Sequence, residues 1–497
     1  MNGFLNFLGR PKRDGLWIAL ALLCVYEILR QPLLYGDAYH MVPEAYGNKW
    51  EHGQHLLYLP LVQVLRSSVG EWFSLSTFEV MSHLSCLTTA LGVWFAHKGF
   101  RALGISRVRA ALGTALSGAA PGVLFFATLV EIHAPFFATA ALAFWAMACL
   151  GKRPGFGRAL VLGLTTGLSA LMHLSGGLMP LPFLLGAWAA GRTGIRDTQE
   201  GGDRFDRLPT FVPSLIGASL GHAFVIGLPF LLRELGVDRI ALTFNSAETY
   251  IRQYAEAPSQ HLWSDLTETF LNEWALAFAP LAVAFLCGLE SRATRRLTVV
   301  TLLSTIPYFI ATFAMLRGHP EHGAYFFAFP FLLAWLTVAS LPRIASALLL
   351  LVALGLGLRD VQDYGDPQRH QAPADQVEAL YPDRDCAFLI GGLIDTELWA
   401  VDRPDDKALY LPLYIFAGEA AFAGLLPNLD AILTEWFDEG RTVLLSPELI
   451  ELSQPGRLGL GGSDVLRNVL LPYLRATYDI VDLPSDGYAG WEIRRKP

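Results

Sequence analysis

Long apolar segments alternate with short polar connections over the first 358 residues, and the chain becomes more polar after them. A helix that crosses a membrane needs about 20 mostly apolar residues. The segments that come close to this length are 15–34, 75–96, 110–130, 134–150, 159–174, 177–190, 211–232, 273–289, 298–316, 325–342 and 344–358. The pattern predicts an α-helical polytopic membrane protein with about 11 transmembrane helices.

Basic residues mark every second connection between these segments. Lys and Arg gather at 10–13, 98–109, 152–158, 192–207 and 292–296, whereas 131–135 and 174–178 contain neither. Because cytoplasmic loops have the excess of Lys and Arg, we expect a cytoplasmic N-terminus behind an uncleaved first anchor. The parts expected outside are 35–74, the turn at Glu131, 233–272, 317–324 and the tail. The chain has no Asn-x-Ser/Thr sequon, which favours a bacterial inner (plasma) membrane.

Three regions depart from plain spanning helices. The outer loop 35–74 is long enough for a short surface helix, with Trp50, Tyr58 and Trp72 as interfacial anchors. The hairpin within 110–150 has Glu131 and His133 as its only titratable residues apart from the thiol of Cys149. The segment 159–190 offers 32 residues for two crossings and is interrupted between His173 and Pro182. We expect short or re-entrant helices there, lining a hydrated outer cavity.

The chain from 359 to 497 alternates strand and helix patterns. CAFLIGG, TVLLS and YDIVDL are short apolar runs typical of strands. NLDAILTEWFDEG and DVLRNVLLPYLRATY are amphipathic and predict helices that end near Gly440 and Thr477. We therefore expect a transmembrane domain at 1–358 and a small extracytoplasmic α/β domain at 359–497.

Charge and cysteine content exclude several function classes. The net charge of −8 offers no basic face for nucleic acid. The five cysteines form no CxxC motif, so the sequence indicates no metal or redox motif and no disulfide framework. No P-loop or GxGxxG follows a strand, so it indicates no nucleotide-binding motif either.

Two acids are candidates for chemistry. A carboxylate at the bilayer centre costs about 2.5–3.5 kcal/mol, so acids near the membrane tend to face protein cavities or water. Asp37 follows the expected end of the first span, and a solvated loop residue explains it equally well. Glu131 is alone among apolar residues in a turn that needs no acid, which favours function. Two such acids in one cavity would supply a general base and a group that positions the acceptor or a metal.

A basic cluster precedes the segment 325–342. Arg317, His319 and His322, with Tyr325 beside them, suit a phosphate held at headgroup depth. The alternative is that Arg317 alone extends to a lipid phosphate.

Histidines and further acids are candidates for the acceptor site or cavity. These are Glu44, Glu51, His52, His55, His133 and His173. A zinc site that uses His40, His52, His55 or His133 is disfavoured because no HExxH or dense ligand set is present. His173 fits a cavity donor or a hydrogen-bonded core histidine, and we expect structural roles for His83, His97 and His222.

Four motifs, in this order and on the outer side, resemble the GT-C superfamily of integral-membrane glycosyltransferases. They are Gly36-Asp37-Ala38-Tyr39, Glu51 to Pro60, Glu131-Ile-His-Ala-Pro135 and Arg317 to Tyr325. The chain is most similar to the bacterial aminoarabinose and mannosyltransferase type, over about the first 340 residues. Many relatives have a second acid next to the first, where this chain has Ala38, which leaves the part of Glu44 or Glu51 open.

The resemblance implies transfer of a hexose or pentose from a polyprenyl-phosphate carrier to a hydroxyl of a glycan, lipid or protein acceptor. Asp37 would be the general base of an inverting single displacement, and Glu131 would assist. No cofactor is required, and a divalent metal stays open. Competing hypotheses are a transporter or lipid flippase, which predicts repeated halves with charges near the midplane, and a receptor-like protein whose tail binds a partner.

Overall fold

The computed structural model describes residues 14–47, 55–190, 208–235, 263, 266–267, 269–290, 292–316, 323–365, 368–382, 385–391, 396–404, 406–411, 419–452, 462–483 and 490–496. The chain folds into two compact units. The first comprises Met1–Arg30, Trp50–Val64 and Ser82–Tyr364, and the second comprises Gln31–Lys49, Leu65–Met81 and Gly365–Pro497. The second unit thus contains residues 365–497, whereas the sequence predicted a domain that starts at 359, and it also contains residues 31–49 and 65–81, which overlap the loop 35–74.

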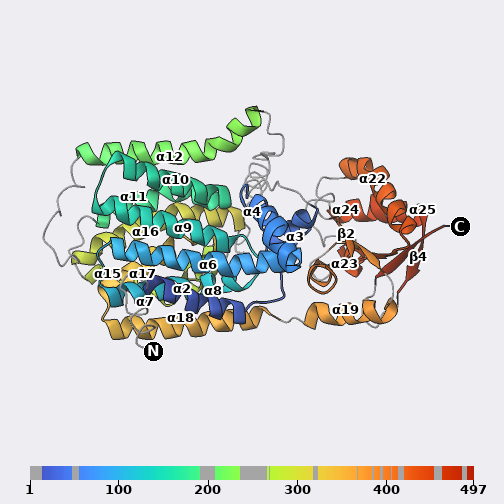
Figure 1. The fold of residues 1–497 in the computed structure, drawn as a ribbon, viewed down its shortest axis with the longest axis horizontal. Coiled ribbons are helices and arrows are strands. Elements are labelled where there is room, and N and C mark those ends of the chain that lie inside the picture. Colours follow the sequence, from blue (N-terminus) through green and yellow to red (C-terminus); the bar gives the residue numbers. More distant parts are fainter. Residues whose placement is uncertain are drawn as a thin grey trace. The chain divides into compact units, whose positions relative to one another are not determined.

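The first unit is a bundle of helices (Figure 1). In chain order these are α2 (Asp14–Ile28), α4 (Tyr58–Leu65), α6 (Thr77–Ala102), α7 (Arg107–Gly118), α8 (Pro121–Thr128), α9 (His133–Lys152), α10 (Phe156–Met172), η2 (Leu174–Leu178), α11 (Pro180–Ala190), α12 (Leu208–Glu234), η3 (Thr269–Leu276), η4 (Leu281–Val283), α15 (Ala284–Glu290), α16 (Arg292–Leu316), η5 (Ala324–Phe326), α17 (Phe329–Ser340) and α18 (Arg343–Tyr364). Helix α12 packs on α10, α10 and α11 pack on α9, and α18 packs on α7 and α8.

Burial separates the inner helices from the outer ones. The apolar window of α9 is 78% buried, whereas the windows of α12 and α18 are 22% buried. Because α12 and α18 are apolar as well, their exposed faces suit contact with lipid.

Each of the segments expected to span coincides with a helix or a bent helix pair. Four helices of the described chain are long and apolar enough to cross a membrane, or up to six if each bent pair is one span. The predicted count of about eleven crossings is therefore not confirmed. Several helices are short because the chain breaks between them, as in the 60° bend between α7 and α8, where Pro121 begins the second helix.

The break expected between His173 and Pro182 is confirmed. Helix α10 ends at Met172, His173 is extended, and the 3₁₀ segment η2 leads into α11 at Pro180. A Cβ at Gly176 would lie 2.4 Å from the Ser169 carbonyl carbon, so only glycine fits this close approach.

The second unit contains a five-stranded sheet with the order β2-β1-β3-β5-β4. The strands are β1 (Cys386–Ile390), β2 (Lys407–Tyr410), β3 (Thr442–Leu445), β4 (Tyr478–Asp482) and β5 (Trp491–Arg495). Strand β1 is parallel to β2 and β3, with Ala387 opposite both Lys407 and Val443, whereas β5 is antiparallel to β3 and β4.

Helices and the loop stretches complete the second unit. They are α3 (Ala38–Tyr46), η1 (Arg66–Gly70), α5 (Glu71–Phe73), α19 (Gln368–Leu380), η6 (Leu398–Asp402), α22 (Glu419–Asp438), α23 (Pro447–Leu452), α24 (Gly462–Val465), η7 (Leu466–Leu470) and α25 (Leu471–Thr477). The three predicted strands and both predicted helices are confirmed. Strands β2 and β5 and helix α19 were not predicted.

The predicted interfacial anchors differ from one another. Trp72 is 84% exposed, whereas Tyr58 is fully buried, so the expectation for Tyr58 is wrong. Helix α4 buries Tyr58 together with Leu59 inside the first unit, so the Tyr58 ring does not reach an interface. Trp50 lies outside the described residues.

We predict that the contact between α10 and α12 depends on the glycines of α12. A Cβ at Gly221 would lie 2.4 Å from the Leu160 carbonyl oxygen, whereas a Cβ at Gly227 would meet nothing within 4 Å. Gly221→Ala should therefore push the helices apart and cost about 1–3 kcal/mol, seen as a lower Tm in detergent. Gly227→Ala is the matched control and should be neutral or slightly stabilising. Equal Tm values for the two variants would contradict the close packing.

Candidate active site

Glu131 and His133 form a buried pair in the first unit. Glu131 lies in the turn between α8 and α9 and is 1% exposed, and His133 begins α9 and is 4% exposed. The Nδ1 atom of His133 is 3.0 Å from Oε1 of Glu131. Pro135 lies in the first turn of α9, where backbone N–H groups have no partner within the helix, so the lack of an N–H in proline costs no hydrogen bond there.

Two more histidines join this pair. The His173 ring centroid is 4.8 Å from that of His133, and His55 stacks on His173 at 5.3 Å. His55 and His173 are both buried. The backbone N–H of Leu57 donates to the carbonyl of Leu171 at 3.2 Å, which ties the segment after His55 to the end of α10.

The orientation of the His173 ring is fixed by the break in the helix. The backbone N–H of Ser175 donates to Nδ1 of His173 at 3.2 Å, and the Ser175 hydroxyl is 2.8 Å from the same atom. A neutral His173 ring that accepts at Nδ1 has its proton on Nε2. The ring therefore offers a donor on its other side.

Tyr325 belongs to the same cluster. It lies in η5, is half-buried, and its ring centroid is 5.0 Å from that of His173 and 6.4 Å from that of His133. Arg317, His319 and His322, which were expected beside Tyr325, lie outside the described residues. The structure brings together five of the predicted site residues, which are Glu131, His55, His133, His173 and Tyr325.

Tyr58 is a member that the sequence analysis missed. Burial, together with the negative charge of Glu131, raises the pKa of Tyr58 well above its usual value, so the phenol keeps its proton. Within the described part of the chain, its hydroxyl has no hydrogen-bond partner, and neither has the buried hydroxyl of Ser82. A buried hydroxyl without a partner costs about 1–3 kcal/mol, so water or a polar ligand is expected beside it. Its position three residues after His55 was the available signal.

Asp37 belongs to the second unit and occupies the N-cap position of α3. The backbone N–H groups of His40 and Met41 donate to its carbonyl at 3.0 Å each. Its carboxylate does not cap the helix, although an Asp at this position usually accepts an N–H of the first turn. The side chain is half-buried. The preceding turn requires Gly36, whose φ is 51°.

Glu44 lies in the last turn of α3 and is 8% exposed. Seven residues separate it from Asp37, so both acids project from about the same face of the helix. Glu51 and His52 lie outside the described residues. Since Asp37 and Glu131 belong to different units, their convergence in one cavity stays a prediction.

Four other histidines of the described chain have ordinary partners. His83 contacts Glu27 at 3.0 Å, His97 contacts Thr114 at 3.2 Å, and His222 contacts Thr166 at 3.1 Å. His40 lies edge-on to Tyr410 at 5.2 Å. In the part of the chain that the structure describes, no three His, Cys, Asp or Glu side chains are grouped as metal ligands.

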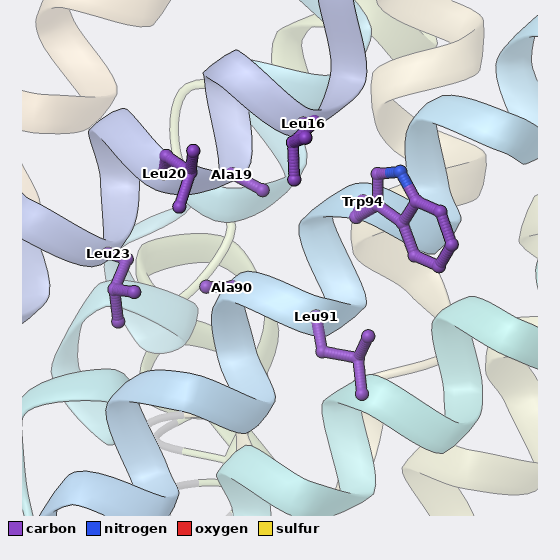
Figure 2. Close-up of a pocket in the computed structure, with 7 residues that line it drawn as sticks. All are labelled: Leu16, Ala19, Leu20, Leu23, Ala90, Leu91 and Trp94. Atoms are coloured by element: carbon purple, nitrogen blue, oxygen red, sulfur yellow. The ribbon is translucent and has the colours of Figure 1, made fainter. Parts of the chain in front are cut away.

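An apolar groove of about 250 Å³ lies between α2 and α6 (Figure 2). Its lining is Leu16, Ala19, Leu20, Leu23, Ala90, Leu91 and Trp94. None of these side chains titrates, so the groove offers no group for acid–base chemistry and suits an acyl chain.

We predict that Glu131 and His133 are energetically coupled. Glu131→Gln and His133→Gln should each lower the free energy of unfolding in detergent, and the double variant should reveal a coupling of about 0.5–3 kcal/mol, since the side chains are in contact and buried. His83→Gln combined with Glu131→Gln is the control, because His83 pairs with Glu27 instead. Additive losses for the first pair would show that the contact contributes nothing.

Comparisons with known proteins give structural matches only, because no protein-family model and no curated protein sequence matches this chain. The crystal structure of ArnT from Cupriavidus metallidurans bound to undecaprenyl phosphate matches with a TM-score of 0.53 and 14% identity. The match covers 96% of this chain and 97% of that one. The archaeal oligosaccharyltransferase AglB from Archaeoglobus fulgidus, in complex with an inhibitory peptide and a dolichol-phosphate, matches with a TM-score of 0.46 and 12% identity. This match covers 97% of this chain and 74% of that one.

The likeness to ArnT extends over nearly the whole of both chains. At this level of identity it establishes the architecture. The resemblance noted in the sequence is thereby confirmed at the level of the fold, and this chain has the fold of the GT-C glycosyltransferases.

Proposed function

We propose that this protein is a glycosyltransferase that moves a sugar from a polyprenyl-phosphate carrier to a hydroxyl of a glycan, lipid or protein acceptor on the outer side of the membrane. The observation that supports this most directly is the buried cluster of Glu131, His133, His173 and His55 within a GT-C fold. Buried ionisable groups are costly in an apolar interior and are therefore retained mainly where they function. The ArnT neighbour, which holds undecaprenyl phosphate, supports the class of donor.

In the proposed reaction, Asp37 accepts the proton of the acceptor hydroxyl as the oxygen attacks the anomeric carbon. The bond between that carbon and the phosphate oxygen breaks, and the polyprenyl phosphate leaves with the bonding electrons. Attack opposite to the leaving group inverts the anomeric configuration. A positioned general base contributes about 10²- to 10⁴-fold to the rate.

Glu131 and its histidines are proposed to orient the acceptor. The Nε2 proton of His173 and the hydroxyl of Tyr58 are donors, while Glu131 is an acceptor, so together they match the alternating donors and acceptors of sugar hydroxyls. Glu44 and His55 are proposed to line the same cavity.

The leaving phosphate requires neutralisation of charge more than a proton. We assign this to Arg317 with His319 or His322, which precede Tyr325 in the chain. The Tyr325 ring centroid is 5.0 Å from that of His173, which supports the assignment. The proposed arrangement has a catalytic membrane domain at 1–358, an extracytoplasmic domain at 359–497 and a cytoplasmic N-terminus. Nothing in the described residues specifically favours a transporter or flippase.

We predict that Asp37→Asn lowers the turnover of a labelled polyprenyl-phosphate sugar by at least 100-fold, because the amide cannot accept the proton. Turnover is measured with purified protein and candidate acceptors. Glu71→Gln is the matched control, since Glu71 is an exposed carboxylate of the same loop and should be silent. Unchanged turnover in Asp37→Asn would reject the assignment of the base.

We also predict that Arg317→Ala weakens donor binding about 10- to 100-fold, the loss expected when a charged hydrogen bond to phosphate is removed. Acceptor binding should be nearly unchanged. Arg359→Ala removes an exposed arginine, paired with Asp363 at 3.0 Å, and serves as the control. Equal donor affinity for Arg317→Ala and the wild type would contradict the phosphate site.

A further inference from the structure

Glu397 is a buried acid that the mechanism above does not use. It lies between β1 and β2, directly before η6, and its relative exposure is 0%. Its Oε1 atom accepts a hydrogen bond from the backbone N–H of Leu34 at 3.0 Å and another from the hydroxyl of Tyr39 at 3.0 Å. The two donors lie three residues before and two residues after Asp37.

A carboxylate with no exposure is tolerated only where hydrogen bonds compensate for its lost hydration. Leu34 and Tyr39 are themselves buried, so these bonds form in apolar surroundings where they are strong. If the Glu397 carboxylate is removed, the Leu34 N–H loses this hydrogen-bond partner. The stretch that contains Asp37 is therefore attached to Glu397 on both sides.

The turn between the two attachment points determines where Asp37 projects. The N–H of Ala38 donates to the Tyr35 carbonyl at 3.0 Å, and Gly36 adopts a positive φ of 51°. Such a short turn has few conformations when both of its flanks are held. Attachment of the flanks thus orients the carboxylate that follows Gly36.

The rest of α3 packs on the same part of the C-terminal domain. His40 lies edge-on to Tyr410 of β2 at 5.2 Å, and Tyr46 lies edge-on to Trp399 of η6 at 5.0 Å. Arg66 closes the C-terminal end of α3, where its Nη1 donates to the carbonyl of Ala45 at 2.8 Å. Basic side chains are favourable at this end of a helix.

The element that presents Glu397 is held in turn by its own contacts. The indole N–H of Trp399 donates to the Asp406 carbonyl at 2.8 Å, and the guanidinium of Arg403 pairs with the Asp406 carboxylate. Trp399 is 1% exposed. These contacts hold η6 in place next to the sheet, and the backbone that carries Glu397 is therefore fixed.

We propose that Glu397 is a positioning residue for Asp37, so that the C-terminal domain contributes to the placement of the general base. This inference rests on the proposed function of Asp37 as the general base. Glu397 acts through the Leu34 to Tyr39 stretch and has no contact with the reacting atoms.

The attachment is tested without reference to activity by hydrogen–deuterium exchange of the full-length protein in detergent. In Glu397→Ala the Leu34 amide should exchange about fivefold faster, the factor expected when one typical hydrogen bond is lost. Glu397→Gln keeps an oxygen acceptor in the same place and should restore slow exchange. Glu378→Ala removes an exposed acid of the same domain and should leave Leu34 unchanged.

The consequence for turnover is tested with the same variants and a labelled polyprenyl-phosphate sugar. Glu397→Ala should lower kcat about 10- to 100-fold, as expected for a base displaced by about 1 Å, while the donor KM stays within twofold. Glu397→Gln should regain most of the turnover. Tyr39→Phe removes the hydrogen bond from the Tyr39 hydroxyl and keeps the one from the Leu34 N–H. This variant should give a smaller loss of kcat, with the Leu34 amide still protected from exchange. It replaces Glu397→Ala if that variant does not fold.

The possible failures are distinguishable. Unchanged exchange at Leu34 in Glu397→Ala, or faster exchange with unchanged kcat, would overturn the role of Glu397 alone. Full turnover in Asp37→Asn would instead overturn the assignment of the base and, with it, the positioning role.

Discussion

A polar group that is buried among apolar side chains must find a partner, and this constraint governs both units of the structure. In the bundle, backbone groups are paired within helices, and small hydroxyls donate to a carbonyl one turn earlier, as Thr298 does to Thr294 at 3.1 Å and Ser304 does to Val300 at 2.7 Å. Such residues need nothing beyond their own helix. The cluster around Glu131 differs, because Glu131 pairs with His133 and the His133 ring contacts that of His173 from a separate segment of the chain.

The segments that meet around Glu131 are places where regular helix stops. His55 precedes α4, Glu131 lies between α8 and α9, and His173 lies between α10 and the 3₁₀ segment η2. Irregular backbone inside a membrane protein is tolerated where it lines a cavity or is packed in protein. The helix breaks and the titratable side chains thus occur together, which is the arrangement that a site for polar substrates requires.

In the second unit, the same constraint connects a loop near the N-terminus to a sheet formed near the C-terminus. Glu397 is satisfied by donors from Leu34 and Tyr39, so the turn at Asp37 is folded against residues that follow it by more than 350 positions. The hydrophobic core beneath, with Trp436, Leu433 and Val443 among its members, makes the sheet a rigid support. A rigid support of this kind limits the positions that the turn at Asp37 can adopt.

The sequence by itself determined where the helices and most strands lie, because apolar periodicity, proline and glycine act over a few neighbouring residues. It also marked Glu131, His133 and His173 as candidates, since titratable groups in apolar segments are conspicuous. It did not determine the number of crossings, because apolar composition does not distinguish a short packed helix from a full span. Tyr58 was misassigned because a tyrosine suits an interface and a buried site equally well. Glu397 has no local signature in Asp-Thr-Glu-Leu-Trp, and only the tertiary structure made it visible, because its partners are brought to it by packing between residues that are distant in the chain.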